Sequence, residues 1–375
     1  MARSVSAENP PAQSTGLSRF SALCARELRG VRYFGSAVRL PQKSEMTGAS
    51  NEHSWLLTVA ASFLAALLAS PACAGNISLP PEALEGMEKI YGGDPDTAIS
   101  IAHALEQAQP DHTIGYLLEG EARWWKRYCA ACEIKYGMFE ASKRGRDPQD
   151  EAFLALTDKV IHLAESQISR SDSAEMHVSA GIGWALKVRV YGLRGENRNA
   201  AHAGVNARAE MLRALQLDPQ MADATAALGV YNYYVDTLSP VVKLLRIFMG
   251  IPGGNKEEGI KQMEVGMNQG VYLAVDARFI LARSLRTYDQ KYEQALAIAE
   301  PLVARYPQNP IFQILLGNLN AELGRKEKAS EYLHEALRLT TPDSACGGCA
   351  RCTDCNTCFM HLHEIAISYL SALHL

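Results

Sequence analysis

The feature that most constrains the fold of this chain is an internal repeat with a period of about 34 residues, within the range of known repeat architectures. Residues 292–296 recur as residues 326–330, so Ala295 and Ala329 occupy the same position of two successive units. In such architectures each unit must stack on its neighbours to bury its apolar face. The chain after residue 75 is therefore predicted to form a stack of similar units.

Each unit is predicted to contain two helices joined by a turn. In the last full unit, apolar residues at helical spacing predict one helix over residues 311–323 and another over residues 327–339, with Gly324 in the turn. The composition favours helices too, because aromatic residues make up only 7% of the chain and runs of Val, Ile and Thr are scarce. The sequence therefore predicts an all-α fold.

Small residues and a proline recur at fixed places in these units. The last unit carries them as Leu316-Gly317, Leu323-Gly324, Ala329, Ala336-Leu337 and Pro342. Small side chains let two helices approach closely, and proline ends the second helix. This pattern resembles the tetratricopeptide repeat (TPR), and the resemblance extends over most of residues 80–342. It implies an α-solenoid of about five or six helical hairpins, similar to the exported TPR proteins of bacteria.

An insertion interrupts the repeat at about residues 237–255. Positions 229 and 283 correspond in two successive units but are separated by more than one period, so roughly 20 residues are added to the unit between them. Residues 239–249 are predicted to form an apolar helix, and Asn255 is predicted to cap the helix that follows. The inserted helix either covers the interior of the solenoid or contacts a partner or a membrane surface.

Residues 1–74 are predicted to lie outside the repeat domain. Residues 55–69 carry no charge and precede Ala72-Cys73-Ala74, a small-x-small pattern that signal peptidases cut. We therefore expect a secretory signal over about residues 46–74, export to the periplasm or the extracellular space, and a disordered extension before the signal. The alternative is a membrane anchor over residues 55–69, although a span needs roughly 20 residues. The chain starts at Met1 or at Met46.

The TPR resemblance implies a concave groove lined by the first helix of each pair. The implied groove positions, most of them aromatic or aliphatic, are Leu117, Trp124, Trp125, Val230, Tyr233, Tyr234, Ile280, Tyr288, Ile314 and Asn318. Family members that clamp a C-terminal carboxylate use Lys, Asn and Arg at these places, and this chain has almost none of them there. The expected ligand is an apolar segment of another protein. Alternatively, these side chains pack inside the stack.

Residues 343–375 are rich in cysteine. Five cysteines recur at every third position and two histidines follow them: Cys346, Cys349, Cys352, Cys355, Cys358, His361 and His363. The C-x-x-C spacing lets two thiolates reach one metal ion, but zinc sites usually separate two such pairs by a longer loop. In an oxidising compartment disulfides compete with zinc. The segment is predicted to hold disulfides or zinc and to end in a helix over residues 358–373 that caps the solenoid.

The net charge of the chain and the absence of known catalytic motifs argue against two further classes of function. A formal net charge of −4 argues against a protein that binds nucleic acid. The sequence contains no G-x-S-x-G, no H-E-x-x-H and no phosphate-binding glycine loop after a strand. We therefore predict a non-enzymatic scaffold or adaptor that binds another protein, without a cofactor unless zinc binds the cysteines. The alternative function is a zinc-binding or thiol-redox protein that acts through the cysteine cluster.

Overall fold

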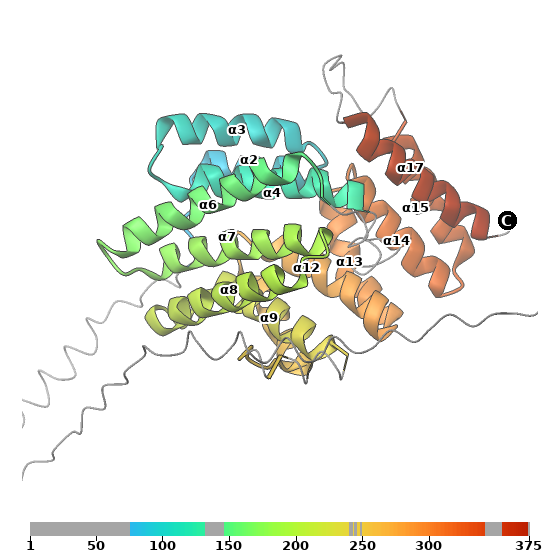
Figure 1. Ribbon diagram of the computed structural model, residues 1–375. Helices are drawn as coiled ribbons and strands as arrows, with labels where there is room; N and C mark the ends of the chain where they lie inside the picture. Colours follow the sequence, from blue (N-terminus) through green and yellow to red (C-terminus); the bar gives the residue numbers. More distant parts are fainter. Residues whose placement is uncertain are drawn as a thin grey trace, which may run out of the picture. The chain divides into compact units, whose positions relative to one another are not determined.

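The computed structural model describes residues 76–131, 146–239, 243, 246–247, 250–341 and 355–373. All of them belong to one unit of the chain, Ala69–Leu375. Within these residues the regular elements are helices (Figure 1): α2 Pro81–Tyr91, α3 Pro95–Ala108, α4 Thr113–Ala131, α6 Gln149–Ile168, α7 Ala174–Leu193, α8 Asn197–Leu217, α9 Ala222–Thr237, α11 Lys256–Gln269, α12 Ala274–Ser284, the π-helix η2 Leu285–Asp289, α13 Tyr292–Arg305, α14 Pro310–Glu322, α15 Lys326–Leu339 and α17 Cys355–Ala372.

Several pairs of neighbouring helices are joined by short turns and pack side by side as hairpins, for example α7 with α8 and α14 with α15 (Figure 1). Helices α13 and α15 begin at Tyr292 and Lys326, which are equivalent positions of two successive units, as the repeat predicts. Helices α14 and α15 match the two predicted helices to within one residue at each end. Gly324 lies in the turn between them with φ of 71°, a backbone conformation that favours glycine. The predicted all-α helical repeat fold is confirmed.

The region of the insertion agrees in part with its prediction. Asn255 precedes α11 and its side chain accepts a hydrogen bond of 2.9 Å from the backbone N–H of Glu258, so the predicted cap is confirmed. Lys243, Arg246 and Ile247 are helical. The other residues of the predicted inserted helix lie outside the described part of the chain.

Helices α9 and α11 approach so closely that glycine is required at their contact. A Cβ atom on Gly259 would lie 2.7 Å from the carbonyl oxygen of Gly229 and 2.7 Å from the backbone nitrogen of Tyr233. A Cβ atom on Gly266 would lie 2.2 Å from the Cβ of Ala226. Most of these neighbours are backbone atoms, so they can yield only if the two helices separate.

We expect Gly259→Ala to lower the free energy of unfolding by about 1–3 kcal/mol, because the added methyl group forces α9 and α11 apart. Denaturant unfolding measures the loss. Gly204→Ala in α8 is the matched control, since its Cβ would meet nothing closer than 3.8 Å. That substitution should instead stabilise the helix by about 0.5–1 kcal/mol. Equal effects of the two substitutions would contradict the close approach.

The N-terminal helices contact the C-terminal half of the repeat domain. The hydroxyl of Tyr272 donates a hydrogen bond of 2.8 Å to the carbonyl oxygen of Leu117 in α4. The amide of Asn309, just before α14, donates one of 2.9 Å to the carbonyl oxygen of Tyr91 at the end of α2. Helix α17 also packs against α4. Side chains of the protein itself therefore fill the space between these helices.

Candidate functional site

The ten predicted groove residues form two sets, one with buried side chains and one with accessible side chains. Buried in the described structure are Leu117, Trp124, Trp125, Tyr233, Ile314 and Asn318. Partly exposed or exposed are Val230, Tyr234, Ile280 and Tyr288. The first set packs inside the stack, as the alternative interpretation of these residues holds. A partner can reach only the second set in this conformation.

Three tyrosines gather where α9 meets the π-helix η2. The ring of Tyr234 lies edge-on to those of Tyr233 and Tyr288, with centroid separations of 5.6 and 6.0 Å. The rings of Tyr233 and Tyr288 are 6.5 Å apart. Tyr233 is buried, whereas Tyr288 is 37% exposed. The cluster therefore has an anchored base and an accessible edge.

Two arginines join this cluster to the neighbouring helices. Arg283 is buried in α12 and donates a hydrogen bond to the hydroxyl of Tyr234. Arg286 in η2 donates to the side-chain oxygen of Asn318 in α14, and at 3.3 Å to the hydroxyl of Tyr369 in α17. We name the accessible residues Tyr234, Arg286, Tyr288 and Tyr369 the tyrosine–arginine surface. It rests on helices that are far apart in the sequence.

The π-helix η2 gives this surface its local geometry. A π-turn holds one more residue than an α-turn, so it shifts the side chains that follow relative to α12. Gln290 ends η2 with φ of 53°, which is uncommon for a residue other than glycine. Such irregular turns occur often at functional sites. Here the turn places Arg286 and Tyr288 together beside α9 and α14.

The buried base of the surface is held by a polar network. The hydroxyl of Tyr233 lies 3.1 Å from the carbonyl oxygen of Ser284 and 3.0 Å from a carboxylate oxygen of Asp289, and these two acceptors share its single proton. Burial, and then the neighbouring Asp289, raise the pKa of Tyr233 well above its usual value, so this phenol stays neutral. Lys256 in α11 forms an ion pair with Asp289. The end of η2 is thereby fixed to α9 and α11.

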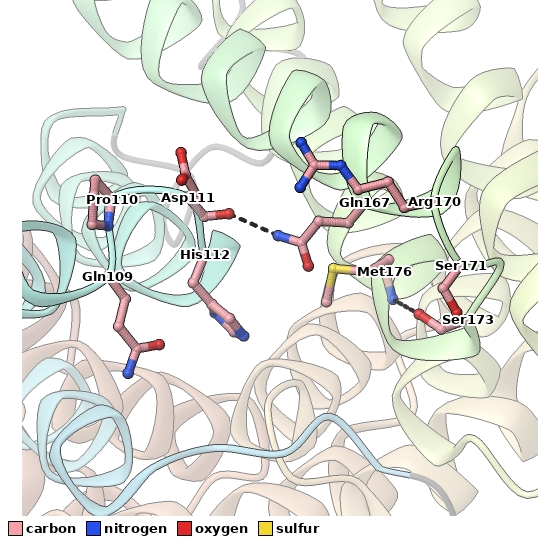
Figure 2. A pocket seen from close by; sticks show the side chains of 9 residues that line it. All are labelled: Gln109, Pro110, Asp111, His112, Gln167, Arg170, Ser171, Ser173 and Met176. Carbon is pink, nitrogen blue, oxygen red and sulfur yellow. Dashed lines mark hydrogen bonds between the residues drawn. The ribbon is translucent and has the colours of Figure 1, made fainter.

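A second feature is a polar hollow of about 550 Å³ between the turn that precedes α4 and the turn that precedes α7. Figure 2 shows the residues that line it: Gln109, Pro110, Asp111, His112, Gln167, Arg170, Ser171, Ser173 and Met176. The amide of Gln167 in α6 donates a hydrogen bond of 2.7 Å to the carbonyl oxygen of Asp111. No local sequence pattern predicts this hollow, because its two turns meet only in the folded chain.

The predicted cysteine cluster falls outside the description of side chains. No side chain is described for Cys346, Cys349, Cys352, Cys355, Cys358 or His361. The last predicted ligand, His363, is described in α17, where its Nδ1 lies 3.1 Å from the hydroxyl of Thr340 at the end of α15. Disulfides and zinc both remain predictions.

Comparisons with protein-family models and with curated protein sequences find no match. Among solved structures, the crystal structure of yeast Tom70 matches with 10% sequence identity and a TM-score of 0.25, covering 78% of this chain and 88% of that one. None of the helices described here has the length and apolar character needed to cross a bilayer.

Stacked helical hairpins and the regular spacing of α13 and α15 define this part of the chain as an α-helical repeat protein. Proteins of this class use their extended surfaces to bind other proteins.

Proposed function

We propose that the protein is an exported, non-enzymatic scaffold that binds a segment of another protein at the tyrosine–arginine surface. The observation that carries this proposal is the exposed ring of Tyr288 beside Tyr234 and Arg286, on a rigid base. Tyrosine and arginine are enriched among the residues that dominate binding energy at protein interfaces. Export rests on the predicted signal over residues 46–74.

The chemistry of this surface favours a segment that combines apolar side chains with hydrogen-bond acceptors. The tyrosine rings offer apolar area at a low cost in side-chain entropy. The guanidinium of Arg286, which Asn318 and Tyr369 hold in place, adds a positive charge that suits carboxylates. The groove residues buried in the core, such as Trp125, are not part of this proposed contact.

Selection of displayed random peptides against the full chain tests the proposal. We expect enriched peptides to bind Tyr288→Ala at least about 10-fold more weakly than the unchanged chain, as truncation of a dominant interface residue does. Leu84→Ala in α2 is the matched control, because Leu84 is a large exposed side chain on another helix. It should leave the affinity unchanged. Absence of enriched peptides, or equal binding by both variants, would refute the proposed surface.

A further inference from the structure

Three potential metal ligands meet on the hairpin of α3 and α4. His103, Glu106 and Glu119 each offer one ligand atom, and these atoms all lie within 4.8 Å of one another. His103 and Glu106 share one face of α3 at i and i+3, while Glu119 reaches them from α4. A Cβ atom on Gly115 would lie 2.8 Å from the Cγ of Glu106, so the carboxylate of Glu106 is held closely against α4.

The two carboxylates of this cluster are partly removed from water. Glu119 is buried, and the Oε1 atom of Glu106 is buried without a hydrogen-bond partner among the described residues. A buried oxygen without a partner is costly. Like charges so close together also need a counter-charge or a proton. The crowding of these partly buried oxygens indicates a place for a positively charged ligand.

Arg123 beside the cluster orients one of its carboxylates, and the cluster keeps a net negative charge. Arg123 donates a hydrogen bond of 2.6 Å to Oε1 of Glu119, one turn away on α4. His103 Nε2 lies 3.2 Å from the same oxygen, as expected of two ligands of one ion. The hydrogen bond from Arg123 orients the carboxylate of Glu119 for binding a metal ion. With Arg123 counted, two ionised carboxylates leave one net negative charge, which a divalent cation overcomes.

We propose that His103, Glu106 and Glu119 bind a divalent transition-metal ion, of which zinc is the best match. One imidazole and two carboxylates are common zinc ligands, and water completes a tetrahedral site. The imidazole selects transition metals over magnesium and calcium, which prefer oxygen ligands alone. The bound ion would clamp α3 to α4. This site uses neither the tyrosine–arginine surface nor the cysteine cluster.

Zinc titration of the full chain tests the site, with calorimetry for stoichiometry and thermal unfolding for stabilisation. We expect His103→Ala and Glu106→Gln each to bind one zinc equivalent fewer than the unchanged chain. His103 has a half-exposed side chain, so its loss leaves the fold intact. Any zinc bound by the cysteines is present in all variants, so it does not affect the difference in stoichiometry between a variant and the unchanged chain. His202→Ala, which removes an exposed histidine from α8, is the control and should bind as much zinc as the unchanged chain.

Competition between metal ions provides a second test of the site. A large molar excess of magnesium should not displace the equivalent of zinc that depends on His103, because its imidazole ligand disfavours magnesium. Equal zinc stoichiometry in the unchanged chain and in His103→Ala would overturn the proposal. Displacement by magnesium would overturn it as well. Neither result bears on peptide binding at the tyrosine–arginine surface.

Discussion

Replacing Arg189 with methionine is expected to lower the free energy of unfolding by about 3–5 kcal/mol near pH 8, because it leaves two buried carboxyl groups without their cation. The guanidinium donates to Glu121 in α4 at 3.0 Å and to Asp276 in α12 at 2.7 Å. The side chains of Glu121 and Asp276 are only 0% and 4% exposed. Arg189 in α7 therefore joins the N-terminal and C-terminal halves of the repeat domain at their buried contact.

The loss caused by Arg189→Met should depend on pH. Burial raises the pKa of Glu121 to about 8 from an ordinary value of 4.5, with Asp276 adding to the rise and Arg189 opposing it. The folded chain therefore keeps a proton that the unfolded chain releases, so this group destabilises the fold increasingly as pH rises from 4.5 to 8. Without Arg189 the carboxyl of Glu121 is harder still to ionise. Below about pH 8 both folded chains hold this proton, so the deficit of the variant should stay level there and grow as pH rises above 8 in urea unfolding.

Two variants separate this charge effect from a general loss of packing. Glu121→Gln on the Arg189→Met background removes the ionisable group of Glu121. The glutamine keeps a side-chain oxygen that can accept the hydrogen bond from the indole of Trp125, which is 3.0 Å long in the unchanged chain. It should recover part of the lost stability. Arg213→Met removes an arginine whose ion pair with Asp172 is largely exposed, and should cost no more than about 1 kcal/mol. A similar cost for Arg189→Met would show that the buried network contributes little.

The sequence was sufficient for the parts of the fold that depend on local pattern. Helices α14 and α15 were predicted to within one residue, because their apolar residues recur at helical spacing and Gly324 separates them. The cap at Asn255 was predictable for the same reason. Its side chain accepts a hydrogen bond from the backbone N–H of Glu258, which is only three residues further along the chain. Each of these features depends on residues close together in the chain.

Features that depend on distant contacts could not be predicted in this way. Trp124 and Trp125 fit a groove lining or a core equally well, since large aromatic residues serve both. The choice depends on whether α4 meets α12 and α14, and no local spacing encodes that contact. Arg286 was missed at the candidate site because its place there depends on contacts with Asn318 of α14 and Tyr369 of α17, which lie far from it in the sequence.

Truncation of Trp125 to alanine is expected to cost about 3–5 kcal/mol, the range for a large buried aromatic side chain. Its ring contacts Tyr91 of α2, Phe279 of α12 and Phe312 of α14, with centroids 5.3, 5.2 and 5.6 Å away. The cavity left by the indole would thus lie between α2 and two helices near the other end of the repeat domain. Denaturant unfolding of the full chain measures the loss.

The location of the effect distinguishes a joint between the two halves from an ordinary core position. If the ring of Trp125 holds the halves together, hydrogen exchange should accelerate in α2, α3 and α4 more than in α15, which contributes no ring to this cluster. Trp184→Ala is the matched control, because that partly exposed tryptophan of α7 lies under Lys187 outside the ring cluster. Its exchange effect should stay within α7 and its neighbours α6 and α8. If Trp125→Ala instead accelerated all helices equally, the two halves would unfold as one cooperative unit, and the contact would be part of a single core.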